Sequence, residues 1–211
     1  FSLNELNEFP IINKFDINKN FESILNDSKS KNVSKTGGTS GLVSYFPTGK
    51  IDSKLNFNRQ VFLRQGFNIK PNSKCLYIWG HSHKFNDSYF KMIKTSFKKK
   101  IKNFYFNRKQ ISAYEFTEKN LQIIVNNILS KKFEYIISYG STLDILINFI
   151  KAKYKTLDTK IKFITTSETV SNKTIENIKN ILPNFELINE FGMAETGVIG
   201  YSKKDNFNVI S

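Results

Sequence analysis

The sequence predicts an α/β fold in which a mostly parallel sheet is flanked by helices. Two observations predict it. From about residue 121 to residue 188, helical patterns alternate with short apolar runs in the order helix, strand, helix, strand, helix, strand. The apolar runs are short and continuous, as strands buried inside a sheet are. Alternation at this spacing favours parallel strands with helices packed on the faces of the sheet.

The elements before this region are shorter. Phe9 is expected to be extended because the residue before a proline avoids the helical region, and Asp16 is placed to cap a short helix. Gly66 fits the end of a longer helix whose apolar residues recur at near-helical spacing. We expect an extended stretch at 8–12, a short helix at 15–25, a glycine loop at 32–41, a short strand at 43–46 and a helix at 54–67.

The later elements follow from apolar runs and polar caps. Thr117 opens the first of the last three helices, and Ser141 or Thr142 is placed to cap the second. Ser171 starts the third, and Pro183 ends it. We expect a strand at 74–80, a helix at 87–97, a strand at 101–106, helices at 121–129, 143–153 and 171–182, and strands at 135–140, 161–166 and 185–188.

The last residues predict a hairpin, with strands at 198–202 and 207–211 around Lys203–Asn206. The second strand reaches the last residue, and the chain begins with Phe rather than Met. We therefore expect residues 1–211 to be part of a longer protein.

The composition excludes several classes of protein. The 211 residues are 39% hydrophobic, which is enough for a core. No run approaches the roughly 20 apolar residues that cross a bilayer, and the first residues have no signal-peptide pattern. The single cysteine, Cys75, excludes an internal disulfide framework and fits a reducing compartment, so we expect a cytoplasmic location.

The net charge of +14 has two interpretations. A basic protein of this kind can bind nucleic acid or another anionic surface. Lysine, asparagine and isoleucine nevertheless recur along the whole chain, as a compositional habit would produce. The main cluster, Lys98–Lys102, follows a helical pattern and is typical of a solvated helix end. The compositional interpretation is favoured, so nucleic acid is not the expected partner.

The stretch KTGGTSG, residues 35–41, has the chemistry of a phosphate-binding loop. Glycines let the backbone N–H groups approach a phosphate closely, and the hydroxyl groups add donors without bulk. The Walker pattern requires Gly-Lys-Ser/Thr after four residues and a following helix, and it is absent here. On this stretch alone, a flexible surface turn would be the better interpretation.

A second stretch, NEFGMAETG at 189–197, changes this balance. A predicted strand leads directly into it, so Glu195 falls just beyond the carboxyl end of a parallel strand. Ligands of open α/β sheets bind at that edge. A carboxylate there is well placed to hold Mg²⁺ that bridges phosphates.

Together the two stretches resemble the adenylate-forming superfamily of acyl-CoA synthetases and adenylation domains. The family's phosphate loop follows the pattern Ser/Thr-Ser/Gly-Gly-Thr-Thr/Ser-Gly, and its second motif follows Asn-x-Tyr-Gly-x-Thr-Glu. Residues 163–169, FITTSET, resemble the strand and turn that carries a Gly-Ala-Glu or Ser-x-Glu element before the second motif. TGGTSG and the early stretch FPIINKFDI are closest to the phenylacetate–CoA ligase-like branch, including relatives linked to capsular polysaccharide biosynthesis.

The resemblance implies roles for the matching residues. Ser167 and Glu168 would lie near the adenine and the acyl pocket. Asn189 would meet the adenine amino group, and Phe191, beside Gly192, would stack on adenine in place of the usual tyrosine. Glu195 would bind Mg²⁺ and act in catalysis together with Thr39. The residues that would wrap the β- and γ-phosphates of ATP are Thr36, Gly37, Gly38, Thr39, Ser40 and Gly41.

The implied reaction has two steps. A carboxylate attacks the α-phosphate of ATP to give an acyl-adenylate and pyrophosphate, and a thiol or amine then displaces AMP. CoA, a carrier protein and an amino sugar all remain open as acceptors. The family's lid lysine and ribose-binding aspartate have no match here, so 1–211 is expected to be part of the large N-terminal adenylation domain, without the C-terminal lid and inactive alone.

Two departures from the family pattern leave other functions open. Ala194 stands where many members have threonine, and no lysine follows the glycine loop. A non-catalytic relative and a basic nucleic-acid-binding module therefore remain as alternatives. A zinc site at Cys75, His81 and His83 is less favoured than two loop histidines, although Trp79 or His81 could line an acyl pocket. No Gly-x-Ser-x-Gly setting supports a hydrolase nucleophile.

Overall fold

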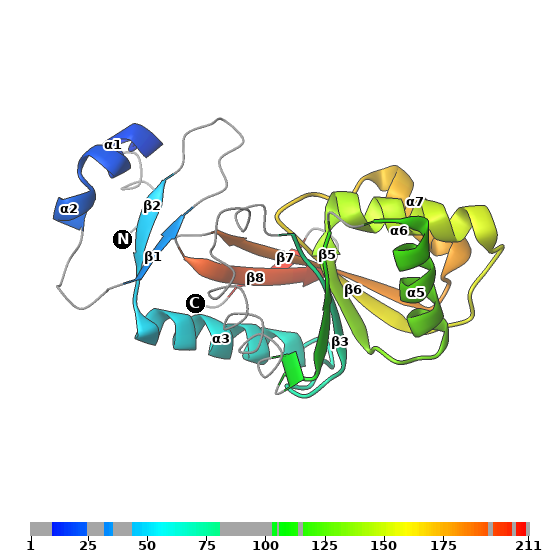
Figure 1. Ribbon diagram of the computed structural model, residues 1–211. Helices are drawn as coiled ribbons and strands as arrows, with labels where there is room; N and C mark the ends of the chain where they lie inside the picture. The colour runs from blue at the N-terminus through cyan, green and yellow to red at the C-terminus, as the bar shows by residue number, and fades with distance from the viewer. Residues whose placement is uncertain are drawn as a thin grey trace, which may run out of the picture. The chain divides into compact units, whose positions relative to one another are not determined.

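The computed structural model describes residues 10–24, 32–35, 44–80, 103–104, 106–113, 116–193, 196–203 and 206–209 (Figure 1). The chain divides into two compact units. One contains residues 1–59 with 193–197, and the other contains residues 60–192 with 198–211. The helix α3, Lys50–Gln65, begins in the first unit and ends in the second.

The first unit contains the short helices α1, Lys14–Lys19, and α2, Phe21–Ile24, and a two-stranded antiparallel sheet. Its strands are β1, Asn32–Lys35, and β2, Tyr45–Thr48. The cap of α1 is Asn13, whose side chain accepts hydrogen bonds from the backbone N–H groups of Phe15 and Asp16. The expectation that Asp16 is the cap is therefore wrong. Its carboxylate closes the capping box by accepting from the Asn13 N–H.

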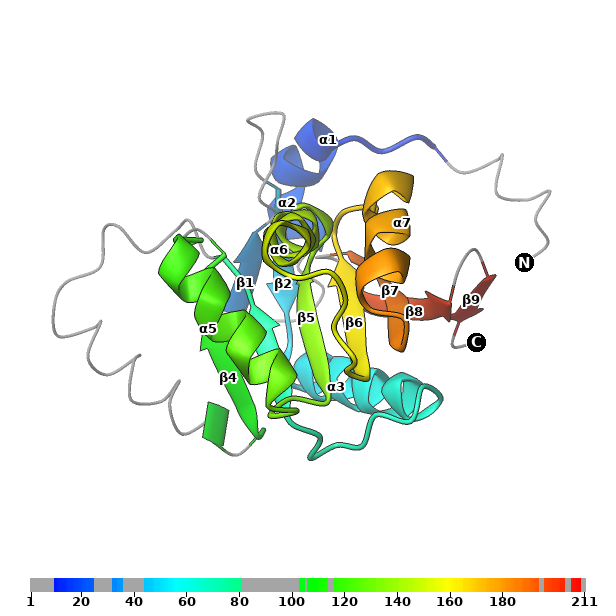
Figure 2. The ribbon, with the colours of Figure 1, turned by 90° about the vertical axis from the view of Figure 1, so that its right-hand side faces the viewer.

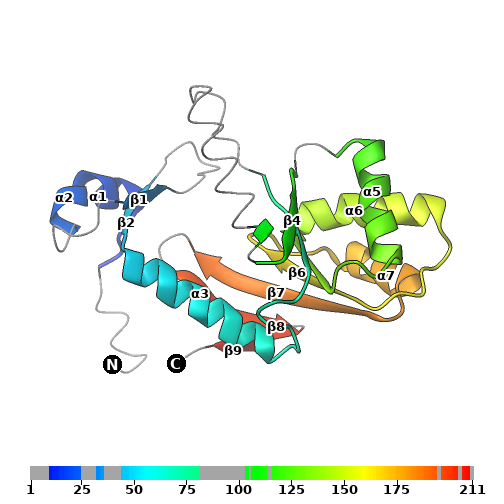
Figure 3. The ribbon, with the colours of Figure 1, turned by 60° about the horizontal axis from the view of Figure 1, so that its bottom comes forward.

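The second unit is built on a seven-stranded sheet in the order β4-β3-β5-β6-β7-β8-β9. The pairs β4–β3, β3–β5, β5–β6 and β6–β7 are parallel, and β8 pairs with β9 antiparallel. Figure 3 shows β7, β8 and β9 following one another at one edge of the sheet. The strands are β3 Cys75–Ile78, β4 Arg108–Ile111, β5 Tyr135–Tyr139, β6 Ile161–Thr166, β7 Phe185–Met193, β8 Gly197–Lys203 and β9 Asn206–Val209.

Three helices cover one face of this sheet: α5 Glu118–Leu129, α6 Gly140–Lys153 and α7 Asn172–Ile181 (Figure 2). Alternate strand residues such as Ile136 and Phe163 pack beneath these helices in the larger core. Their neighbours Ile137 and Ile164 pack in a second core on the opposite face, with Leu63 of α3. The sheet is therefore buried on both sides, which explains why its central strands are continuously apolar.

Most of the expected elements are confirmed. The alternating helices and strands from α5 to β7 form the parallel sheet, and Thr117 and Ser171 cap α5 and α7. The C-terminal hairpin is also present as β8 and β9, with Lys203 opposite Asn206. The expected helix at 87–97 lies outside the described residues, and only Tyr45 and Phe46 of the expected strand at 43–46 lie in β2.

Four expectations about element bounds are wrong. Residues 32–35, expected in a loop, form β1. Of the strand expected at 101–106, Asn103 and Phe104 are helical, and the strand begins only at Arg108 after a turn in which Asn107 has φ +48°. The helix expected at 143–153, α6, begins at Gly140, without a side-chain cap from Ser141 or Thr142. The strand expected to end at residue 188 continues to Met193.

Within the described part of the chain, no helix combines the length and the apolar character that a membrane crossing requires.

The packing of α6 gives a test of this fold. Leu146 is 1% exposed, and its neighbour Ile145 is 47% exposed. We expect Leu146→Ala to lower the free energy of unfolding by about 2–5 kcal/mol, because it leaves a cavity beneath the helix. Ile145→Ala removes a similar apolar side chain from the exposed side and should cost under roughly 1 kcal/mol. Urea denaturation measures both, and equal losses would contradict the assigned core face.

Candidate functional site

Polar side chains gather at the carboxyl edge of the parallel strands β5, β6 and β7. Ser138 lies opposite Thr165, and Thr165 lies opposite Asn189, so the three residues form a row across the strands. In registered parallel strands such neighbours point to the same face. The apolar Ile136 and Phe163, two residues earlier, lie on the face covered by α5, α6 and α7. On that face of the sheet, the apolar residues are therefore followed by polar groups at the carboxyl ends of the strands.

Asn189 is held in place within this row. Thr165 is 1% exposed, and its hydroxyl donates a hydrogen bond of 2.9 Å to Asn189 Oδ1. The amide oxygen retains one lone pair, and the NH₂ group retains its two donors. Asn189 is half-buried. It therefore presents an oriented amide that can both donate and accept at the edge where α/β sheets bind ligands.

The next row faces the other side of the sheet and carries larger side chains. It consists of Tyr139, Thr166 and Glu190, which lie opposite one another in β5, β6 and β7. The Tyr139 ring lies 4.4 Å from that of Trp79, between centroids, and the Trp79 ring stacks at 5.3 Å on that of Tyr77. These three aromatic residues are half-buried and form a wall beside the polar edge.

Glu190 is part of a buried charged cluster. Arg64 of α3 approaches Glu190 Oε2 to 3.1 Å and donates from Nε to the Tyr201 hydroxyl at 2.9 Å. The Tyr201 hydroxyl in turn donates to Glu190. The Arg64 and Glu190 side chains are only 17% and 11% exposed. The cluster therefore ties the end of α3 to β7 and β8.

The pKa values agree with fixed protonation states in this cluster. Burial acts to lower the pKa of Arg64, but Tyr201 and Glu190 raise it above its ordinary value overall. Burial, together with Glu190, raises the pKa of Tyr201 despite the opposing effect of Arg64. The guanidinium therefore stays charged, and the phenol stays neutral and able to donate.

The turn after β6 contributes a carboxylate to a neighbouring helix. Glu168 Oε2 accepts a hydrogen bond of 2.8 Å from the Ser141 N–H, in the first turn of α6. Ser167, before it, has φ +68°, in the left-handed region. The two chain segments approach closely, since a Cβ at Gly140 would lie 3.0 Å from the Thr169 carbonyl oxygen. Glu168 thus supplies the cap that α6 lacks in its own sequence.

The residues expected in the site are only partly described. Asn189, Phe191 and Gly192 lie on β7 rather than in a loop after it, and the Phe191 ring is 49% exposed at the end of that strand. Ser167 and Glu168 lie in the turn after β6. The expected phosphate loop, residues 36–41, and Glu195 lie outside the described residues, as do Ala194, His81 and His83.

The zinc site weighed at Cys75, His81 and His83 is not tested, because both histidines lie outside the described residues. No group of three or more His, Cys, Asp or Glu side chains among the described residues could hold a metal ion. Cys75 is 2% exposed, and burial raises the pKa of its thiol to about 11. A buried thiol with so high a pKa is a weak nucleophile at neutral pH.

Several residues at this edge escaped sequence analysis. Arg64 and Tyr201 fell within an expected helix and an expected strand. No local pattern indicates their contacts with Glu190, which join residues 126 and 11 positions apart along the chain. Thr165 and Tyr139 fell within strands whose apolar residues set the pattern. Alternation along β7 beyond Ile188 would have separated the faces of Asn189 and Glu190.

Comparison with known proteins identifies the fold. No family model matches the chain, and no curated protein sequence does. A 2-hydroxyisobutyryl-CoA ligase solved with 2-HIB-AMP and CoA matches over 94% of this chain and 43% of its own, at 14% identity and a TM-score of 0.60. A long-chain-fatty-acid-CoA ligase from Archaeoglobus fulgidus matches over 82% of this chain and 33% of its own, at 15% identity and a TM-score of 0.55.

A luciferase-like enzyme from the nonluminescent Zophobas morio mealworm matches over 85% of this chain and 38% of its own, at 13% identity and a TM-score of 0.50. The chain therefore shares its fold with part of the acyl-CoA ligases, and the expected fold class, a mostly parallel sheet flanked by helices, is confirmed. It spans less than half of the length of each of these structures.

The buried cluster predicts non-additive stabilities. Glu190→Leu should lower the free energy of unfolding by about 3–5 kcal/mol, because Arg64 is left buried and unpaired. Arg64→Met should have a similar effect for the converse reason. The double variant should cost clearly less than the sum, and chemical denaturation of all four proteins closes the cycle. The exposed pair Lys153–Glu118 is the matched control, and additive behaviour at both pairs would contradict the assignment.

The buried Cys75 thiol should resist a disulfide reagent at pH 8 in the folded protein and react fully in denaturant.

Cys75 also predicts a pH dependence of the free energy of unfolding. The pKa of about 11 exceeds the ordinary value of 9.0, so the folded state holds this proton more tightly. The resulting stability is present below pH 9 and is lost as the pH rises towards 11. The free energy of unfolding, measured between pH 9 and 10, should therefore fall as the pH rises, and Cys75→Ala should reduce this slope.

Proposed function

We propose that the protein activates a carboxylate with ATP, forming an acyl-adenylate that is then transferred to a thiol or an amine. The observation that carries this proposal is the oriented Asn189 amide at the carboxyl edge of the sheet, in a fold shared with acyl-CoA ligases. The motif NEFGMAE begins at that residue. The related ligase solved with 2-HIB-AMP and CoA is the precedent for an acyl-adenylate in this fold.

The nucleotide base is assigned to the end of β7. Asn189 can accept from an adenine amino group with its remaining lone pair, because Thr165 fixes the orientation of the amide. Phe191 follows two residues later with a half-exposed ring, which is suited to stacking on a base. Ser167 lies beside this row in the turn after β6. Glu168 lies there too, but its carboxylate caps α6 and is already engaged.

The phosphates are assigned to the loop Thr36–Gly41, whose backbone N–H groups and hydroxyls suit phosphate oxygens. Thr39 and Glu195 are the proposed catalytic residues. Glu195 follows β7 and would hold Mg²⁺, which neutralises phosphate charge when bound. A lone carboxylate fits Mg²⁺, because this ion commonly takes one or two carboxylates and completes its shell with phosphates and water.

The chemistry at this edge is a displacement at phosphorus. A carboxylate oxygen bonds to the α-phosphorus, the bond to the bridging oxygen of the β-phosphate breaks, and pyrophosphate leaves with the electron pair. Both partners are anionic, so the protein's contribution is to align them and to neutralise charge. A thiol or amine then attacks the acyl carbon, AMP leaves, and the attacking atom loses its proton.

The acyl group is assigned to the aromatic wall on the other face of the edge. Trp79 and Tyr139 lie with ring centroids 4.4 Å apart beside Thr166 and Glu190, and offer a flat apolar surface. Such a surface suits an apolar or aromatic carboxylate better than a highly charged one. This agrees with the proposed place in the phenylacetate–CoA ligase-like branch, including capsular polysaccharide relatives. The acceptor is CoA, a carrier protein or an amino sugar.

Glu195→Ala tests the proposal in carboxylate-dependent ATP–pyrophosphate exchange. We expect exchange to fall by at least roughly a hundredfold, because a group that stabilises developing charge is lost. The assay requires the protein with all of its domains and a panel of carboxylic acids, aromatic acids among them.

Glu176→Ala is the matched control, because it removes an exposed carboxylate from α7 and should leave exchange unchanged. Exchange at the original rate in Glu195→Ala would contradict the site. ATP binding without exchange for any carboxylate would instead favour a non-catalytic relative.

A further inference from the structure

The edge of the sheet opposite the proposed active site contains a basic pocket of about 500 Å³. It lies at the amino ends of the parallel strands, where Lys74 precedes β3, Arg108 begins β4 and Lys132 precedes β5. Lys109 of β4 contributes a fourth positive charge. A pocket of this volume falls in the range of small-molecule sites.

The charges of this pocket are not balanced by its own lining. Among the residues that the structure describes, no acidic side chain lines it. Elsewhere in the described chain, lysines pair with carboxylates, as Lys203 does with Glu186 at 2.9 Å. The neighbouring Glu134 is engaged by Ser73 Oγ at 2.6 Å and by the Lys74 N–H at 3.1 Å. Like charges gathered in one pocket repel, so an anion bound there would relieve a cost that the free protein carries.

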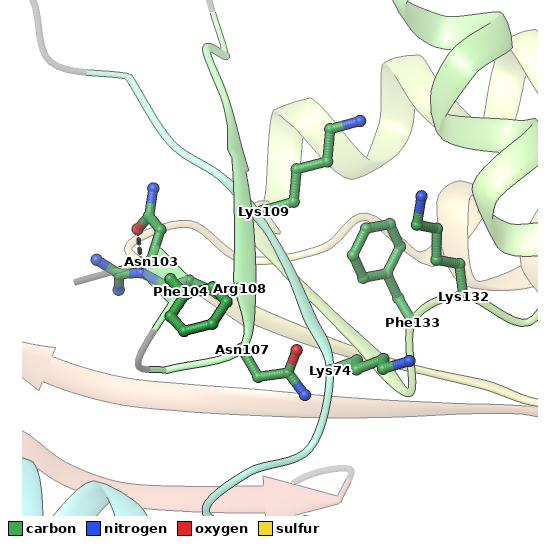
Figure 4. Close-up of a pocket in the computed structure, with 8 residues that line it drawn as sticks. All are labelled: Lys74, Asn103, Phe104, Asn107, Arg108, Lys109, Lys132 and Phe133. Atoms are coloured by element: carbon green, nitrogen blue, oxygen red, sulfur yellow. Dashed lines mark hydrogen bonds between the residues drawn. The ribbon is translucent and has the colours of Figure 1, made fainter. Parts of the chain in front are cut away.

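One of the cations is already ordered. Arg108 Nε donates to Asn103 Oδ1 at 2.7 Å, and the guanidinium lies 5.1 Å above the Tyr77 ring centre. Figure 4 shows Arg108 and Asn103 on one side of β4, and Lys109 and Lys132 extending on the side of Phe133. Pre-ordering lowers the entropy lost on binding, so Arg108 supplies a fixed positive charge on that side of β4.

Two phenylalanines give the pocket an apolar part. Phe133 is 6% exposed and belongs to the core beneath α5 and α6, so its ring forms a rigid floor of the pocket. Phe104 is 90% exposed at the rim, which is unusual for so large an apolar side chain. An exposed ring beside positive charges is the combination with which proteins bind a base and its phosphate together.

We propose that this pocket binds a nucleoside phosphate, with its phosphates at Lys109 and Lys132 and its base against Phe104. The site is separate from the nucleotide assigned to Asn189, since the pocket lies at the amino ends of β3, β4 and β5, and Asn189 lies towards the carboxyl end of β7 in the same sheet. The proposal therefore does not depend on the proposed activity.

ADP and inorganic pyrophosphate are the probes, titrated calorimetrically into the protein at low salt. Lys109→Glu combined with Lys132→Glu should raise the Kd for both roughly tenfold or more, because charge-assisted hydrogen bonds are lost. Lys173→Glu combined with Lys179→Glu makes the same change in net charge on exposed positions of α7 and should leave both Kd values within about twofold.

Phe104→Ala separates the base from the phosphates. It should raise the Kd for ADP roughly fivefold or more and leave that for pyrophosphate unchanged, because only ADP has a ring to stack. Asn189→Ala should leave this binding intact, and the Lys109→Glu, Lys132→Glu protein should retain ATP–pyrophosphate exchange. Failure of exchange in the unaltered protein would overturn the proposed function but not this site.

Three results would overturn the proposed site. One is equal weakening by the α7 control, which would mean attraction by net charge alone. Another is loss of ADP binding in Asn189→Ala rather than in the pocket variants. The third is displacement of ADP by an oligothymidylate at far lower concentration, with a steep salt dependence, which would indicate a nucleic-acid groove.

Discussion

The candidate site depends on one constraint, the side-by-side register of β5, β6 and β7. Because successive strand residues point to opposite faces, the same register that aligns Thr165 with Asn189 also aligns Thr166 with Glu190. One face of the edge therefore receives an oriented amide, and the other receives a carboxylate and aromatic rings. A shift of one residue would exchange the two sets, and would move Glu190 away from Arg64 to the face covered by α5, α6 and α7.

The buried cluster of Arg64, Glu190 and Tyr201 helps to fix this register. Its desolvation is costly, and apolar side chains of similar volume would often stabilise the fold as well or better. What the charges add is directionality: Arg64 and Tyr201 can satisfy Glu190 in one arrangement of α3, β7 and β8. In the proposed function, the residues on either side of Glu190 hold the base, so the cluster would act on catalysis through position alone.

Sequence analysis predicted the interior of the second unit well and its margins poorly. Apolar periodicity and the caps Thr117 and Ser171 are local signals, so α5, α7 and the central strands could be located from the residues themselves. The polar segment Arg108–Ile111 carries no such signal, because an edge strand need not be apolar on both faces. Ser141 and Thr142 looked like caps, but the cap of α6 arrives from Glu168, 27 residues along the chain from its partner Ser141.

The candidate site divides in the same way. Asn189, Phe191 and Ser167 could be singled out because short motifs carry them, whereas Thr165, Arg64 and Tyr139 became visible only through strand register and tertiary contacts. The TGGTSG loop and Glu195 lie outside the described residues, so their roles remain proposals from sequence.

The capping of α6 by Glu168 links the turn after β6, beside the proposed adenine site, to a helix that extends away from that turn. The carboxylate oxygen that holds the Ser141 amide cannot at the same time serve a ligand fully. Any molecule that recruits Glu168 must therefore compete with the first turn of α6, and its apparent affinity is reduced by the free energy of that turn. Fraying of the first turn of α6 and binding of a ligand by Glu168 would therefore be coupled in a single equilibrium.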